Sequence, residues 1–322
     1  MKGSSNRKNN LRPYTCKASL VSSDVQTFIS LIRDAQQKLC TDLESIDGKS
    51  KFSSDPWRSE KGNGLTRDGA IFEKAGVNTS IVEGVLSAAR ADALRRRGRE
   101  IQPGEKYRAA ALSFVMHAQS PHVPTLRGDV RIFASEGGIS VGGGVDLTVF
   151  YVCPEQIAAF HRHWKSVCDA YDADLYSKLK EQCDDYFYIP SRAEHRGVGG
   201  LFYDDLPLSS SRCVQFSSDM LDNFLPSFLP ILRQNCVLPY TAQQKRWQRI
   251  RRGRYLEFNL LNDRGVRFGL AGAHYSRTDA IMISAPPSVE WPYGYDVEPN
   301  SLEWRTVHLL RGKPVDWARC AF

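Results

Sequence analysis

Three strand-like runs follow one another between residues 107 and 152, and the segments that join them are short. The runs are "AALSFVMHA" at 110–118, "DVRIFAS" at 129–135 and "VDLTVFYV" at 145–152. Neighbouring parallel strands need a crossover of a dozen or more residues, usually a helix, whereas antiparallel strands need only a turn. Helical patterns lie before and after these runs. The sequence therefore predicts an α+β fold with a large, mainly antiparallel β-sheet covered by helices.

The run "TLRGDVRIF" at 125–133 has one charged face. Side chains on a strand alternate between faces, so one face carries only apolar residues and glycine, while the other carries Arg127, Asp129 and Arg131. The guanidinium group of arginine binds carboxylates bidentately. Two arginines on either side of an aspartate therefore suit a small ligand that has several carboxylates.

Helices are predicted in several segments outside these strands. Apolar residues at helical spacing indicate an amphipathic helix from Ser23 to a stop at Gly48. Pro154 fits the first turn of a second helix. Thr241 and Gln244 have the spacing of a capping box, which predicts the start of another helix.

The last third of the chain combines a basic run with two strand-like patterns. The run "KRWQRIRRGR" at 245–254 is interpreted as a solvated helix face whose arginines form ion pairs, in preference to a stripe that binds nucleic acid. The segment "RYLEFNLLNDRGVRFGL" at 254–270 is interpreted as a hairpin that turns at 262–265. The run "AIMISAPP" at 280–287 is interpreted as a final strand.

Composition limits the classes of partner and compartment. The net charge of +7 favours anionic partners, and no apolar run approaches the ~18 residues of a membrane span. Eight scattered cysteines without a CxxC pair are typical of a reduced, soluble intracellular protein. Residues 1–22 hold basic but no acidic residues, which indicates either a disordered tail or an organelle transit segment. Residues 23–322 are expected to form a single domain.

Two patterns that suggest ligand sites have simpler explanations. The glycines of "VGGGVD" at 141–146 match no phosphate-binding motif, and they are interpreted as a close backbone approach within a sheet. Asp146 is two residues after the last of these glycines, so its side chain would be able to contact a ligand that approaches this backbone. His161 and His163 are two residues apart, so on a helix they diverge and cannot easily share a metal ion.

Several blocks, in this order along the chain, resemble the oxygen-dependent coproporphyrinogen III oxidases from about residue 24 onward. The blocks are "DGAIFEKAGVNTSIVEG", "HAQSPHVPTLRGDVRIF", "GGGVDLTVFY", "DLYSKLKEQCDDYFYI", "RGVGGLFYDDL", "RRGRYLEFNLLNDRG" and "AIMISAPP". The resemblance implies a homodimer whose sheet has helices on both faces and encloses a cleft for a porphyrinogen. It also implies oxidative decarboxylation of the propionates on rings A and B to vinyl groups, with dioxygen as co-substrate and no organic cofactor.

The resemblance also assigns roles to individual residues. Asp146 matches the aspartate proposed to hydrogen-bond the pyrrole N–H groups and to drive proton removal, and Arg131 and Arg127 complete the expected catalytic group. The substrate-binding positions implied by the resemblance are Ser113, Asp129, Arg131, Arg196, Asp263, Arg264, Ser276 and Arg277.

Departures from the family pattern concentrate around Arg127. Family members have histidine there, often assigned as a proton donor, in the motif T-[IV]-H-x-N, and the following asparagine is Asp129 in this chain. Arginine stays protonated at neutral pH and is a poor acid, so it cannot take that role unchanged. Arg127 and Ser191 also replace two of four histidines sometimes assigned as metal ligands, so no metal site is expected. The family's "WWFGGG" is "ISVGGG" here.

Two hypotheses follow from this comparison. The first is a divergent coproporphyrinogen oxidase in which Arg127 and Asp129 are a substituted pair, with Cα atoms about 6–7 Å apart on one strand face and so within reach of an ion pair. The second is a non-catalytic, homodimeric tetrapyrrole-binding or scaffold protein that retains the fold.

Overall fold

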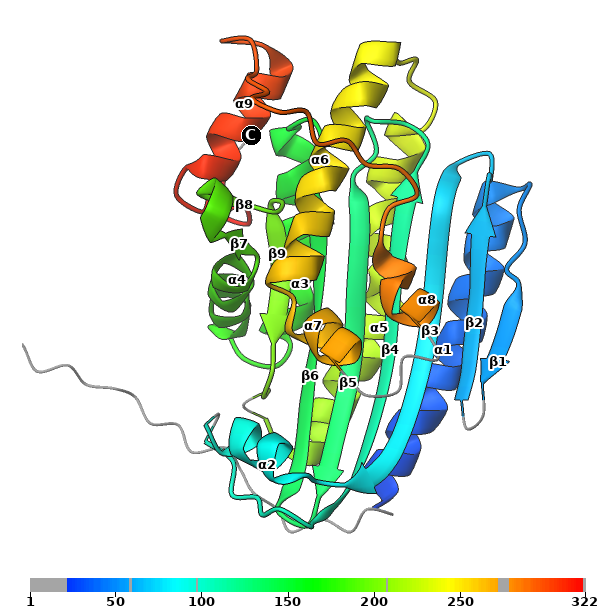
Figure 1. Ribbon diagram of the computed structural model, residues 1–322, viewed down its shortest axis with the longest axis vertical. Coiled ribbons are helices and arrows are strands. Elements are labelled where there is room, and N and C mark those ends of the chain that lie inside the picture. Colours follow the sequence, from blue (N-terminus) through cyan, green and yellow to red (C-terminus); the bar gives the residue numbers. More distant parts are fainter. Residues whose placement is uncertain (1–21, 58–59, 97, 207, 272–277, 321–322) are drawn as a thin grey trace, which may run out of the picture.

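The computed structural model describes residues 22–57, 60–96, 98–206, 208–271 and 278–320 (Figure 1). Its centre is a seven-stranded sheet in the order β1-β2-β3-β4-β5-β6-β9, with every neighbouring pair antiparallel. The strands are β1 (Ser54–Trp57), β2 (Glu60–Arg67), β3 (Phe72–Val85), β4 (Lys106–Ala118), β5 (Thr125–Ser135), β6 (Gly138–Thr148) and β9 (Gly199–Tyr203). A separate two-stranded sheet pairs β7 (Tyr188–Ile189) with β8 (Glu194–His195). The predicted α+β fold with a mainly antiparallel sheet is confirmed.

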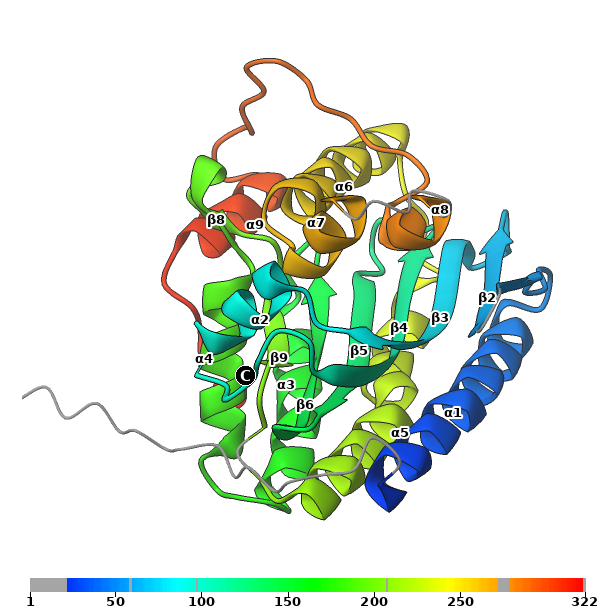
Figure 2. The same ribbon diagram turned by 60° about the horizontal axis from the view of Figure 1, so that its bottom comes forward.

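Helices cover both faces of the large sheet (Figure 2). One face carries α1 (Ser23–Asp47), α3 (Pro154–Asp169) and α5 (Ser210–Asn235). The other carries α2 (Ala88–Arg95), α6 (Ala242–Leu261), α7 (Arg264–Ala271) and α8 (Thr278–Ile281). Helix α4 (Leu175–Tyr186) contacts the edge strand β9, and α9 (Leu302–Arg311) contacts β8. Short 3₁₀ turns span Pro190–Arg192 and Met282–Ser284. Among the described residues, no helix is both long and apolar enough to cross a bilayer.

The alternation of β5 is as predicted. Leu126, Val130 and Ile132 are buried in the main hydrophobic core beneath the sheet. Gly128 belongs to the same face, since a Cβ atom placed on it would lie 2.6 Å from the ring of Phe114. The opposite face of β5 therefore presents its charged residues toward the α6–α7 side of the molecule.

Two predictions for the C-terminal third are wrong. Residues 254–270 do not form a hairpin, because α6 continues to Leu261 and α7 begins at Arg264. Asp263 separates the two helices, and its Oδ1 accepts a hydrogen bond from the backbone N–H of Val266 at 2.8 Å, as an N-cap does. The expected strand at 280–287 is instead the end of α8 followed by a 3₁₀ turn.

The basic run at 245–254 is helical but only partly solvated. Arg251 and Arg252 are buried, and they pair with Glu194 at 2.7 Å and with Glu73 at 2.8 Å. The prediction of ion pairs is confirmed, whereas the prediction of a solvated face is wrong for these two arginines. Burial of a charge is tolerated here because each guanidinium has a carboxylate partner.

Candidate active site

A cavity of about 590 Å³ lies over the charged face of the sheet. Strands β4, β5 and β6 form its floor, and residues of α2, of the end of α4 and of the α6–α7 junction line its sides. Figure 2 shows α2 and α7 on this same side of the sheet. A volume of this size is typical of sites for small molecules and cofactors. We refer to this cavity as the cleft.

Strand register brings several of the predicted site residues together on the floor of the cleft. Arg127 lies directly opposite Asp146 of β6, and Asp129 lies directly opposite Ser113 of β4. Residues opposite each other on antiparallel strands have Cβ atoms about 4.5–5.5 Å apart. The positions selected from the sequence are therefore neighbours in space, although up to 33 residues separate them in the chain (146 − 113 = 33).

Small residues flank the charged ladder of β5 and keep the floor flat. Ala109 and Ala111 of β4 and Gly144 of β6 line the cleft. A Cβ atom on Gly144 would lie 2.7 Å from the backbone oxygen of Leu201 on β9, so only glycine fits without movement of the backbone. This supports the interpretation of the glycine run as a close backbone approach, and it leaves room above the sheet for a flat ligand.

Asp146 is held in place by Arg196. Nη2 of Arg196 lies 2.7 Å from both carboxylate oxygens of Asp146, and Nη1 donates a hydrogen bond to Asn259 at 3.1 Å. The guanidinium is fully buried, and it lies 4.0 Å from the ring centre of Phe187 and 4.6 Å from that of Tyr255. Arg196 does not line the cleft, so in this structure it serves Asp146 and not a bound ligand.

Arg127 pairs with Asp263, and Asp129 pairs with Arg131. Nη1 of Arg127 lies 3.5 Å from a carboxylate oxygen of Asp263 and donates a hydrogen bond to Asn259 at 3.3 Å. The expected pair between Arg127 and Asp129 is wrong, because the α6–α7 junction brings Asp263 to Arg127 while Arg131 binds Asp129 on the same strand.

The pKa of Arg127 is raised above its usual value, so the side chain remains a cation. Burial disfavours the charged form, but Tyr255 and the carboxylates of Asp263 and Asp129 outweigh that effect. An arginine with such neighbours cannot release a proton in the accessible pH range.

A second group of charges lies at the side wall, around Asp204. This carboxylate pairs with Arg131 at 3.1 Å and with Arg264 at 2.7 Å. The rings of Tyr186 and Phe202 stack between these arginines at 4.0 Å. Arg131 and Arg264 are predicted site residues, whereas Asp204 is not, and its only signal in the sequence is the adjacent aspartates of "YDDL" at the end of β9.

The structure does not place every predicted site residue. Ser276 and Arg277 lie outside the described residues. The histidines at 161 and 163 have separate partners, since His161 contacts Tyr176 and the backbone of Val198, and His163 contacts Asn223. In the part of the chain that the structure describes, no group of three or more metal-binding side chains occurs.

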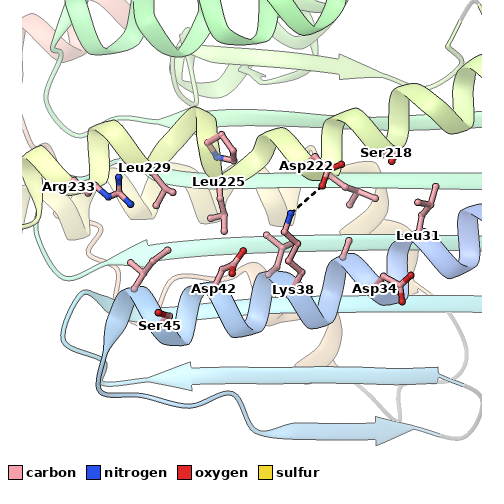
Figure 3. Close-up of a pocket in the computed structure, with 15 residues that line it drawn as sticks. Leu31, Asp34, Lys38, Asp42, Ser45, Ser218, Asp222, Leu225, Leu229 and Arg233 are labelled. Carbon is pink, nitrogen blue, oxygen red and sulfur yellow. Dashed lines mark hydrogen bonds and ion pairs between the residues drawn. The ribbon is translucent and has the colours of Figure 1, made fainter.

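A second cavity, of about 470 Å³, lies on the opposite face of the molecule between α1 and α5 (Figure 3). An ion pair between Lys38 and Asp222 crosses it at 3.3 Å. None of the predicted site residues lines this cavity. The cleft over the sheet is therefore the candidate active site.

Comparisons with known proteins identify the family of this chain. The family model described as coproporphyrinogen III oxidase matches residues 27–317. The mitochondrial oxygen-dependent coproporphyrinogen-III oxidase of Rattus norvegicus is 40% identical over 308 residues, which cover 91% of this chain and 69% of the relative. The human protein of the same name is 40% identical over 302 residues, which cover 90% of this chain and 66% of the relative. The chloroplastic protein of Glycine max is 38% identical over 305 residues, which cover 90% of this chain and 78% of the relative.

This chain belongs to the coproporphyrinogen III oxidase family. It spans about two thirds of the length of the mammalian relatives that it matches.

Proposed function

We propose that the protein is an oxygen-dependent coproporphyrinogen III oxidase of haem or chlorophyll biosynthesis, which converts the propionates on rings A and B of its substrate into vinyl groups. The relatives in mammals and plants carry that name. The observation that carries the proposal is the position of Asp146, whose carboxylate lines the cleft while Arg196 holds it in place. A fixed carboxylate on the floor of the cleft suits the ring of N–H donors in a porphyrinogen.

The remaining residues of the cleft suit the other parts of the substrate. The macrocycle lies on the small residues of β4 and β6, with its N–H groups directed at Asp146. Arg131 and Arg264 are at the side wall, where they bind propionates. Ser113 and Asp129 lie opposite each other on the floor of the cleft, where they offer hydrogen-bond partners to the ligand.

The chemistry requires removal of two electrons and one proton from the substrate as each propionate reacts. Each propionate carboxylate loses carbon dioxide and one proton as it becomes a vinyl group, and the two electrons pass to dioxygen, which takes up two protons to form hydrogen peroxide. Asp146 accepts hydrogen bonds from the pyrrole N–H groups and stabilises the positive charge that develops on the ring. No organic cofactor is needed, because the substrate supplies the electrons and dioxygen accepts them.

Arg127 supplies a fixed positive charge beside Asp146 and does not donate a proton. It lies within the cleft, close to any carboxylate or reduced oxygen species that forms there. Protons consumed by dioxygen reduction then come from water or from another donor, in contrast to the role assigned to the family's histidine.

The second candidate is a non-catalytic protein that binds a tetrapyrrole. The replacement of histidine by Arg127, and the engagement of Arg127 with Asp263, favour it. An assay that mixes the protein with coproporphyrinogen III without oxygen and then admits air separates the two candidates. We expect vinyl products by chromatography, whereas porphyrin binding without any product above the buffer level would support the second candidate.

Two further properties are proposed with this function. We expect a homodimer, which light scattering on the purified chain would measure directly. We also propose that the basic residues 1–22 direct the protein to a mitochondrion or plastid, because the relatives are described as mitochondrial or chloroplastic. Fusion of these residues to a fluorescent protein tests the second point.

A further inference from the structure

We propose that Asp204 occupies a carboxylate site of the cleft and must be displaced by a carboxylate of the ligand. This inference rests on the proposed function and adds a residue that sets affinity and selectivity. Asp204 bridges Arg131, from the floor strand β5, and Arg264, from the start of α7. It thus lies where a propionate held by both guanidinium groups would lie.

The two arginines are held in place independently of Asp204. The rings of Tyr186 and Phe202 stack with an angle of 7° between their planes. Arg264 lies over the Tyr186 ring at 4.7 Å, and Arg131 lies over the Phe202 ring at 5.5 Å. Contacts of this kind favour a cation over the face of an aromatic ring. The aromatic pair therefore keeps two positive charges at the wall whether or not Asp204 lies between them.

Other contacts give Arg131 a second anchor. Nη2 of Arg131 donates a hydrogen bond to the backbone oxygen of Tyr203 at 3.1 Å, and Nη1 binds Asp129. When Asp204 leaves, Arg131 keeps these partners and stays oriented. Arginines that are already ordered lose little conformational entropy when a ligand binds.

Asp204 is positioned to leave without disturbing the sheet. Strand β9 ends at Tyr203, so Asp204 is the first residue beyond the ladder. The chain is fixed again at Leu206, whose N–H bonds to the backbone oxygen of Val141 at 3.0 Å. The side chain of Asp204 is 27% exposed, so solvent and ligand reach it.

Competition by an internal carboxylate has two consequences. A ligand carboxylate gains only the difference between its own interactions and those of Asp204, which lowers affinity. A ligand that lacks a negative charge at this point cannot displace Asp204. The site therefore discriminates against uncharged analogues. Removal of the charge at residue 204 should therefore strengthen binding of polycarboxylates and leave binding of their esters unchanged.

The test compares Asp204→Asn with Asp205→Asn. Asp205 is a matched control because it is the next residue, is 32% exposed, pairs with Arg99 and does not line the cleft. The probes are coproporphyrin III and its tetramethyl ester, both in the same non-ionic detergent, followed by fluorescence titration. We expect Asp204→Asn to bind coproporphyrin III about three- to tenfold more tightly than the wild type, in line with an exposed ion pair. The ester should show no gain, and Asp205→Asn should show none with either probe.

Equal or weaker binding of coproporphyrin III by a folded Asp204→Asn variant would overturn the inference, and so would an equal gain for the ester. A wild type that binds neither probe would instead contradict the proposed function itself. If Asp204→Asn does not fold, Arg264→Gln provides the second test. Arg264→Gln should reduce coproporphyrin affinity less in the wild-type background than in the Asp204→Ala background, because Asp204 neutralises part of the Arg264 charge. Equal losses in the two backgrounds would also overturn the inference.

Discussion

Nη2 of Arg196 lies 2.7 Å from each carboxylate oxygen of Asp146, and both side chains are buried. The pair joins the floor of the cleft to the aromatic rings of Phe187, Tyr255 and Phe258, which surround the Arg196 guanidinium. The carboxylate is therefore oriented before any ligand arrives. Such preorganisation is useful only if the carboxylate itself interacts with the reacting group.

Removal of Arg196 should destabilise the whole protein. Arg196→Met leaves the carboxylate of Asp146 without its partner in a buried position, and we expect the free energy of unfolding to fall by about 3–5 kcal/mol. Urea denaturation measures this change. The control is Arg192→Met, which removes an ion pair with Glu257. Because the Arg192 side chain is 41% exposed, this substitution should lower the free energy of unfolding by less than about 1 kcal/mol. Similar losses for both variants would contradict this account, because the buried pair of Arg196 and Asp146 would then contribute no more than an exposed pair.

Arg127→His should introduce a pH dependence that the natural chain lacks. Arg127 stays charged because neighbouring Tyr255 and carboxylates raise its pKa despite burial. Histidine, with an ordinary pKa of about 6.5, would lose its charge between about pH 6 and 8. We expect kcat/KM of the variant to change across that range as the imidazole at residue 127 loses its proton. The wild type should not show this change. Superimposable pH profiles would show that the charge at residue 127 does not affect turnover.

The buried histidines should make the protein less stable in mild acid. Burial lowers the pKa of His161 to about 3, whereas the unfolded value is about 6.5. Between these values the unfolded state binds more protons, so the free energy of unfolding falls as the pH drops below 6.5. The loss from His161 is about 1.4 kcal/mol per pH unit, or about 2 kcal/mol at pH 5.

Denaturation of His161→Asn between pH 5 and 7 checks this prediction. The variant should show a shallower slope of unfolding free energy against pH than the wild type. His117, whose pKa burial also lowers well below its usual value, should account for part of the remaining slope. The control His308→Gln removes an exposed imidazole and should keep the wild-type slope. An unchanged slope in His161→Asn would contradict the account.

The sheet and the floor of the cleft were predictable from local patterns. The alternation of β5 alone placed Arg127, Asp129 and Arg131 on one face, because a strand with one buried face leaves its register little freedom. The antiparallel pairing of β4, β5 and β6 then followed from the short segments that join them. Neither inference required knowledge of distant contacts.

Helix α6 shows where sequence patterns fail. Its buried face includes Arg251 and Arg252, whose partners Glu194 and Glu73 are far away in the sequence. Charges on the buried face hide the 3.6-residue period, so the segment that follows them was interpreted as a hairpin. The pair of Arg127 with Asp263 was missed for the same reason, because it depends on where α6 ends.

The roles of individual arginines were also beyond the sequence. Arg196 and Arg131 look alike as potential partners for a propionate. Only the structure shows that Arg196 is fully buried and paired with Asp146, while Arg131 lines the cleft. A short sequence pattern does not show whether an arginine pairs with a carboxylate of the protein or faces the ligand.

Turnover of coproporphyrinogen III by Asp146→Asn tests the central claim most directly. Asparagine keeps the shape of the side chain but is a weaker hydrogen-bond acceptor. If the single variant unfolds because Arg196 is left unpaired, the double variant Asp146→Asn/Arg196→Gln takes its place. Chromatography of vinyl products should show kcat lower by about 10²–10⁴ than in the wild type, with coproporphyrin binding retained. A folded variant that forms the vinyl products at the wild-type rate would contradict the assignment of Asp146 as the central group of the reaction.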